Sequence, residues 1–152
     1  MLYYFAYGSN LHHLQMKKRC PNCRFIKKIT LNNYKLTFRS KYGAADIERK
    51  IGKKVYGALY IISKTAEKRL DVYEEYPTLY KKMYFKCQNK KVMTYIMVKK
   101  SKLVPPTIKY LNVIKQGKVG VSIVIRFTEE DLISICYKDI EDFIKKKKIE
   151  IV

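Results

Sequence analysis

The chain has 152 residues, 47% of them apolar, which is enough to bury a core and argues against intrinsic disorder. No run approaches the roughly 18 consecutive apolar residues of a membrane span, and the first ten residues lack the features of a signal peptide, so we expect a cytoplasmic protein that does not enter a membrane. Its formal charge of +20 comes from basic residues scattered along the chain. Charge alone therefore does not identify a binding partner, and it does not exclude nucleic acid.

The first half of the chain predicts strands around one short helix. Residues 2–7 are wholly apolar and aromatic, as in a strand covered on both faces. Gly8 ends this strand, and Ser9 or Asn10 can cap a helix that runs to about Arg19. Further strands are expected at 24–29, 34–39 and 55–62, with a turn at Asn32 and Asn33, a loop and short strand within 42–50, and a close backbone approach at Gly57.

The second half continues the mixture of helices and strands. Ser63 begins a predicted helix that continues through Leu70 and ends before Pro77. The remaining expected elements are strands at 80–87 and 91–98, a helix from Pro105 to Gly117, and a helix after a capping box at 128–131. Hairpin strands interspersed with helices indicate an α+β fold, and without a linker or repeat the sequence predicts a single domain over residues 1–152.

Two of the four cysteines, Cys20 and Cys23, have the CxxC spacing of zinc or redox sites. A structural zinc needs two more ligands, and the sequence has no second CxxC, CxxH or HxxxH. The adjacent His12 and His13 would point about 100° apart on a helix, so they would chelate one ion poorly. We therefore expect free thiols and no metal site.

The stretch YGSNL, residues 7–11, places a glycine where the first strand ends. Glycine permits a sharp turn and lets a ligand approach the backbone closely. Successive N–H groups at a strand-to-helix turn point into one concavity, which favours a carboxylate or phosphate. An ordinary capped turn uses the same residues, so the triplet Gly-Ser-Asn by itself leaves both interpretations open.

Three acids, Asp71, Glu74 and Glu75, lie among tyrosines near the end of the second predicted helix. The helix dipole disfavours carboxylates at that end. A carboxylate walled by Tyr73, Tyr76 and Tyr80 would have a raised pKa and would be competent to move a proton. Alternatively, these acids pair with nearby lysines on the surface. Tyr110, in the later predicted helix, can likewise either line a pocket or pack in the core.

Together, these segments resemble the γ-glutamylcyclotransferase family. YFAYGSNL, residues 4–11, is similar to the N-terminal signature of that family, and GAADI followed by VYGALY resembles its middle strands. RLDVYEEYPTLY resembles the segment that bears its catalytic glutamate, and PTIKYLNVIKQG its later tyrosine-bearing helix. The resemblance covers roughly residues 3–120 and implies a compact, mixed, β-barrel-like sheet with flanking short helices.

The resemblance also implies roles for individual residues. A γ-glutamyl substrate would be bound through its α-carboxylate by the backbone of Tyr7, Gly8, Ser9, Asn10 and Leu11. Glu74 would be the general acid/base, and Tyr110 would line the pocket. The family usually has glycine after its catalytic glutamate, and here Glu75 stands there, so either acid can face the pocket. Asp46, in GAADI, stands where the family commonly has a small hydroxyl residue.

Such an enzyme cyclises a γ-glutamyl amide to 5-oxoproline and releases the free amine. Because the substrate's own α-amine is the nucleophile, one carboxylate can move the protons and no metal or other cofactor is required. The expected partner is a small-molecule γ-glutamyl substrate whose leaving amine the sequence does not identify. The alternative is a non-catalytic module of the same fold that binds an acidic metabolite or, through its basic surface, RNA.

Overall fold

The structure is a computed structural model that describes residues 1–119. The helices and strands, in chain order, are β1 (Leu2–Ala6), the 3-10 helix η1 (Ser9–Leu11), α1 (His13–Arg19), β2 (Arg24–Arg39), β3 (Ala44–Ile62), α2 (Lys64–Tyr73), β4 (Tyr80–Cys87), β5 (Lys90–Met97) and α3 (Ile108–Val119). The predicted capping box at 128–131, the helix after it and Cys136 lie outside the described residues, as does the C-terminal part of the expected domain.

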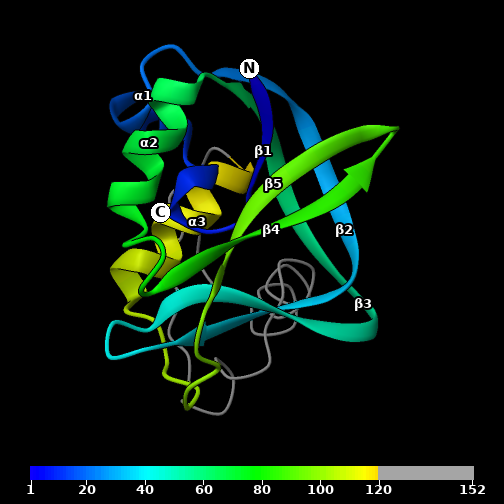
Figure 1. The fold of residues 1–152 in the computed structure, drawn as a ribbon. Helices are drawn as coiled ribbons and strands as arrows, with labels where there is room; N and C mark the ends of the chain where they lie inside the picture. Colours follow the sequence, from blue (N-terminus) through cyan, green and yellow to red (C-terminus); the bar gives the residue numbers. More distant parts are fainter. Residues whose placement is uncertain (120–152) are drawn as a thin grey trace.

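One mixed sheet joins the strands in the order β2-β3-β1-β5-β4. The central strand β1 pairs antiparallel with β3 and parallel with β5, and its Phe5 and Ala6 are fully buried, as the apolar run predicts. The three α-helices lie on one side of the sheet (Figure 1). The α+β prediction is confirmed, but the described sheet is open rather than barrel-like, because β2 and β4 form its two edges.

The two strands predicted on either side of Asn32 and Asn33 are a single strand, β2. It pairs antiparallel with β3 along nearly its whole length, and the chain reverses at residues 40–43 instead. Asn33 adopts a φ of 62° at a shift in register, and its Oδ1 accepts a hydrogen bond from the Gly52 N–H at 3.1 Å. The asparagine pair therefore forms a bulge within a continuous ribbon, because a left-handed residue serves a bulge as well as a turn.

The close backbone approach expected at Gly57 is confirmed. A Cβ at this position would overlap the ring of Phe5 and the carbonyl oxygen of Ala6 on the neighbouring strand β1. Ser63 also behaves as predicted, because its Oγ accepts a hydrogen bond from the Ala66 N–H at 3.0 Å and caps α2. These two features fix how β1 meets β3 and where α2 begins.

The helix expected from Ser9 or Asn10 to Arg19 is divided into two pieces. The first forms the 3-10 turn η1, and α1 begins only at His13. Neither Ser9 nor Asn10 caps α1, because both side chains hydrogen-bond toward the site described below. Among the helices of residues 1–119, none combines the length and apolar character needed to cross a bilayer.

Candidate active site

A pocket of about 300 Å³, counting its open mouth, lies where β1 passes into η1. Its walls come from elements throughout the described chain: Tyr4, Tyr7, Gly8, Ser9, Asn10, Ala45, Glu74, Tyr80, Tyr95 and Tyr110. A wider depression adjoins it and shares Ser9, Glu74, Tyr80 and Tyr110 with it. The depression extends to the exposed rings of Tyr42 and Tyr73. Six of the seven residues expected at a site therefore meet in one place.

Leu11 is the seventh expected residue, and the structure does not bring it to the pocket wall. Its side chain is buried in the core, and its N–H donates to the carbonyl oxygen of Gly8 at 3.0 Å. The N–H groups of Ser9 and Asn10 stand at the start of the same 3-10 turn, where the first amides of a helix have no partner within it. Gly8, Ser9 and Asn10, at the start of η1, line the pocket at the place where the sequence predicts a concavity.

Glu74 immediately follows α2 and is half-buried beside Asn10. The Asn10 Nδ2 donates to the Glu74 Oε1 at 3.0 Å. Burial raises the pKa of Glu74 to about 7, while the Arg19 cation and the Asn10 hydrogen bond oppose that rise. A carboxyl group with this pKa is present in both protonation states near neutral pH, which is the property of an efficient proton shuttle.

Glu75 is exposed and lies outside the inner pocket, so the structure distinguishes the two adjacent acids. Its φ is +50°, a left-handed conformation that glycine adopts without steric cost. This explains in physical terms why glycine suits the position after Glu74. The turn tolerates a side chain here because Glu75 is exposed, at the lining of the wider depression.

Arg19 is the main site residue that sequence reasoning missed. Its Nη1 donates to the Asn10 Oδ1 and, at 3.0 Å, to the Ser9 Oγ. Its Nη2 donates to the Tyr73 hydroxyl, and the guanidinium carbon lies 3.6 Å from the centroid of the Tyr73 ring. In the sequence Arg19 is one of 33 basic residues and follows two lysines, so no local signal separates it from a solvated helix end.

Five tyrosines surround the pocket. The sequence analysis named Tyr7 and Tyr110 as site residues and Tyr80 as a tyrosine beside the carboxylate. The Tyr7 hydroxyl donates to the Tyr95 carbonyl oxygen at 2.7 Å, and the Tyr80 hydroxyl donates to the Ala45 carbonyl oxygen at 2.6 Å. The Tyr110 hydroxyl accepts from the Ala45 N–H at 3.1 Å, which leaves its own proton available to donate. Burial raises the pKa of each of these phenols, so they are neutral hydrogen-bonding groups at ordinary pH.

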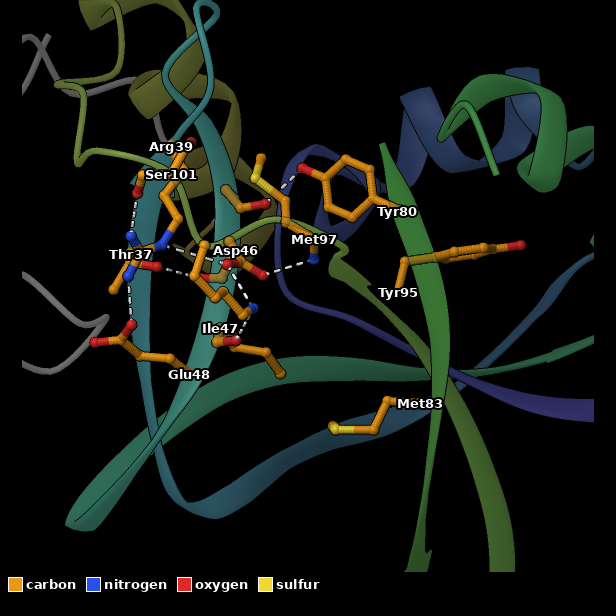
Figure 2. Close-up of polar contacts among 12 residues, drawn as sticks. Thr37, Arg39, Asp46, Ile47, Glu48, Tyr80, Met83, Tyr95, Met97 and Ser101 are labelled. Atoms are coloured by element: carbon orange, nitrogen blue, oxygen red, sulfur yellow. Dashed lines mark hydrogen bonds and ion pairs between the residues drawn. The ribbon is translucent and has the colours of Figure 1, made fainter. Parts of the chain in front are cut away.

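Asp46 lies next to Ala45 and has no exposed surface, but it points away from the pocket. Its carboxylate accepts from the Met97 N–H at 2.9 Å and the Lys100 Nζ at 2.7 Å, and the Arg39 Nε lies 3.5 Å away. In Figure 2, Arg39 and Met97 approach the Asp46 carboxylate, and Tyr80 lies beyond Met97. Asp46 therefore ties β3 to the end of β5 and fixes the backbone that receives two pocket tyrosines.

Asp71 takes part in a separate network. It accepts from the Tyr95 hydroxyl at 2.6 Å and pairs with the Lys82 Nζ, which also contacts Glu67. Part of the acidic stretch thus pairs with a lysine, as one of the two interpretations held. The other part, Glu74, faces the pocket.

No histidine or cysteine of the described residues lines the pocket. The His12 Nε2 lies 3.1 Å from the Gln116 Oε1, and the His13 Nδ1 lies 2.9 Å from the Tyr60 hydroxyl. Cys20 and Cys23 are free thiols, and burial raises the pKa of both, to about 11 for Cys20. Within residues 1–119, no three His, Cys, Asp or Glu side chains gather as metal ligands would.

The family model for gamma-glutamyl cyclotransferase, AIG2-like proteins matches residues 4–116. The chain belongs to this family. The match begins at the pocket residue Tyr4 and includes Glu74 and Tyr110, so the whole inner pocket lies within the family domain. A search of curated proteins found no significant sequence match.

Solved structures share the fold. One described as a gamma-glutamyl cyclotransferase is 24% identical, with a TM-score of 0.67, over 95% of this chain and 98% of its own. The protein ytfP from Escherichia coli is 20% identical, with a TM-score of 0.54, over 68% of this chain and 91% of its own. An AIG2-like protein from Mus musculus is 16% identical, with a TM-score of 0.54, over 73% of this chain and 82% of its own. At these identities the likeness concerns the fold.

Proposed function

We propose that this member of the gamma-glutamyl cyclotransferase family converts a γ-glutamyl amide to 5-oxoproline and a free amine. The observation that carries the proposal is one carboxylate, Glu74, with a pKa near 7 at the wall of a pocket otherwise lined by neutral side chains and backbone. Sequence resemblance and pocket geometry point to the same residue. The acid next to it, Glu75, is exposed and lies outside the inner pocket.

The proposed reaction forms one bond and breaks another within the substrate. The α-nitrogen attacks the γ-carbonyl carbon, a C–N bond closes the five-membered ring, and the original amide C–N bond breaks. Glu74 takes a proton from the substrate's α-ammonium group and donates it to the leaving nitrogen, so it returns to its starting state. The ring nitrogen loses a second proton when the ring closes, and the released amine takes up one proton in turn to become an ammonium ion. Its pKa near 7 suits both transfers, since neither protonation state is strongly disfavoured at neutral pH.

The remaining pocket groups are proposed to fold the flexible substrate into attack geometry. The N–H groups of Ser9 and Asn10 and the adjacent glycine form the concavity that would hold the α-carboxylate. The Tyr110 hydroxyl, which accepts from the Ala45 N–H, would donate its own proton in a hydrogen bond to a substrate oxygen. Orientation of this kind supplies a large part of the acceleration in an intramolecular reaction.

The adjoining depression is where the leaving amine would extend. It opens from the same Glu74 side chain that would protonate the departing nitrogen, and its outer rim carries Tyr42 and Tyr73. Both γ-glutamyl-amino acids and γ-glutamylamines are therefore proposed as substrate classes to test. The proposed reaction needs no cofactor, because the nucleophile belongs to the substrate.

The test is 5-oxoproline release from a panel of γ-glutamyl dipeptides and γ-glutamylamines. Glu74→Gln is expected to lower kcat/KM on the order of 100- to 10,000-fold while the variant stays folded. Glu75→Gln is the matched comparison, because it removes the same charge one residue away, and it is expected to keep most of the turnover. Near-wild-type activity of the Glu74 variant would refute the assignment. No turnover by wild type, with tight and steeply salt-dependent RNA binding, would favour the binding module.

A further inference from the structure

Arg19, the last residue of α1, joins three separate parts of the site. Its guanidinium group donates to the side chains of Ser9 and Asn10 in η1 and to Gln15 one turn back in its own helix. It also donates to the hydroxyl of Tyr73, the last residue of α2, and stacks on that ring. Since Glu74 directly follows Tyr73, Arg19 links the amide concavity to the segment that carries the carboxylate.

The hydrogen bond to Asn10 has a directional consequence. An asparagine amide has one acceptor oxygen and one donor nitrogen, so fixing the oxygen fixes the nitrogen. Because the Asn10 Oδ1 accepts from Arg19, its Nδ2 is turned toward the Glu74 Oε1 at 3.0 Å and the Tyr4 hydroxyl at 2.9 Å. Without Arg19 the amide loses the donor that holds its oxygen, and only the acceptors on Tyr4 and Glu74 retain its orientation. A flipped amide would present its oxygen to the carboxylate, which repels it.

Arg19 also supplies the positive charge that acts on the carboxylate. Burial is the largest influence on the pKa of Glu74 and raises it, whereas the Arg19 cation lowers it. Within residues 1–119, the other ionisable groups that interact with Glu74 are phenols whose own pKa values are raised by burial: Tyr4, Tyr7, Tyr80, Tyr95 and Tyr110. These phenols are neutral at ordinary pH, so among the described groups the charge that favours ionised Glu74 comes from Arg19 in α1.

We propose that Arg19 is a positioning residue that orients the Asn10 amide and the end of α2, so that the Glu74 carboxylate faces the pocket under the influence of the guanidinium charge. This inference rests on the proposed function, since it assigns Arg19 a task in presenting the proton-transferring group. Arg19 acts through Asn10 and Tyr73 and is not among the residues that line the pocket.

The experiment compares Arg19→Gln, Arg19→Lys and the control Lys18→Gln, which removes a neighbouring exposed charge from the same helix. The first measurement is a carbon-13 NMR titration of the Glu74 carboxyl group in substrate-free protein, assigned with Glu74→Gln. Wild type and the control are expected to titrate near 7, and Arg19→Gln at higher pH. Lysine keeps the charge without the planar fork, so Arg19→Lys is expected to titrate closer to wild type.

The second measurement is the pH profile of kcat and KM for 5-oxoproline release. Both Arg19 variants are expected to lose kcat on the order of 10- to 100-fold through misorientation, with a smaller change in KM. In Arg19→Gln, the acidic limb of the profile is also expected to move to higher pH. If Arg19 had only a structural role, its replacement would lower activity without shifting the NMR titration of Glu74 or the acidic limb of the pH profile.

The outcomes separate this inference from the proposed function. A folded Arg19→Gln variant whose Glu74 titrates as in wild type overturns the inference, even where activity falls. Full kcat in Arg19→Lys overturns the part assigned to the guanidinium fork, and this variant decides the matter if Arg19→Gln does not fold. If wild type releases no 5-oxoproline from any substrate, the proposed function fails, but the NMR titration still tests the coupling of Arg19 to Glu74.

Discussion

Replacing Glu74 with glutamine is expected to stabilise the protein at alkaline pH. The folded-state pKa of Glu74 is about 7, above its ordinary value of 4.5, so the folded protein holds this proton more tightly than the unfolded chain does. Below about pH 4.5 Glu74 is protonated in both the folded and the unfolded state, so its contribution to the free energy of unfolding does not change with pH. As the pH rises, the unfolded chain ionises first, so stability falls until the folded-state pKa is passed and then levels off.

The size of the effect follows from the pKa difference. A shift of about 2.5 units at about 1.36 kcal/mol per unit gives about 3 kcal/mol, which is an upper bound because Glu74 is only half-buried. Glutamine has nearly the same shape and can still accept the hydrogen bond from Asn10. Glu74→Gln should therefore match wild type near about pH 4 and exceed its free energy of unfolding by up to about 3 kcal/mol near about pH 9.

Urea unfolding of both proteins at about six pH values between those limits measures this difference. Other groups with shifted pKa values, such as Lys115 and His13, are present in both proteins and cancel in the comparison. A difference that stays constant across the range would show that Glu74 ionises as it does in the unfolded chain, and would refute the argument. A stabilised variant without activity would show that the carboxylate is kept at this position in spite of its effect on stability.

Three further substitutions test other parts of the structure by urea unfolding. Gly57→Ala should lower the free energy of unfolding by about 2–4 kcal/mol, since a methyl group there overlaps Phe5; a smaller loss would mean that β1 and β3 can separate easily. Asp46→Ala should lower the free energy of unfolding by about 3–5 kcal/mol, because Lys100 and the buried Arg39 lose the carboxylate with which they pair. A variant of unchanged stability would contradict that pairing. Glu75→Gly should raise it by up to about 1 kcal/mol and preserve 5-oxoproline release, whereas a clear loss of stability would contradict the left-handed backbone.

The parts of the fold that sequence predicts well depend on local chemistry. The buried strand β1, the Ser63 cap and the end of α2 before Pro77 follow from short patterns of apolar, capping and breaking residues. The Asn32 and Asn33 pair shows the limit of such patterns. A left-handed asparagine suits both a turn and a bulge, and only pairing with the distant part of β3 decides between them.

The candidate site could be predicted where a sequence motif marks it. It could not be predicted where residues far apart in the sequence come together only in the folded structure. YGSNL and the acids near Tyr73 are distinctive as strings and carry the family resemblance that implies Glu74, with Glu75 as the alternative. Arg19 reaches the site through a hydrogen bond to a residue 54 positions away, which no local pattern indicates. Tyr4 and Tyr95 are likewise two of 14 tyrosines, distinguished by the pocket into which they fold, whereas Tyr80 could be expected beside the acids because it is close to them in the sequence.

The pocket draws its walls from β1, η1, β3, β4, β5, α3 and the residue after α2, so it exists only when these elements are assembled. Ligand binding and global folding are therefore thermodynamically linked, and a molecule that occupies the pocket stabilises every one of these elements together. At a concentration of 100 times its Kd such a ligand adds about 2.7 kcal/mol to the free energy of unfolding. Thermal unfolding of the intact protein can thus rank amines and γ-glutamyl compounds as ligands before any turnover assay is available.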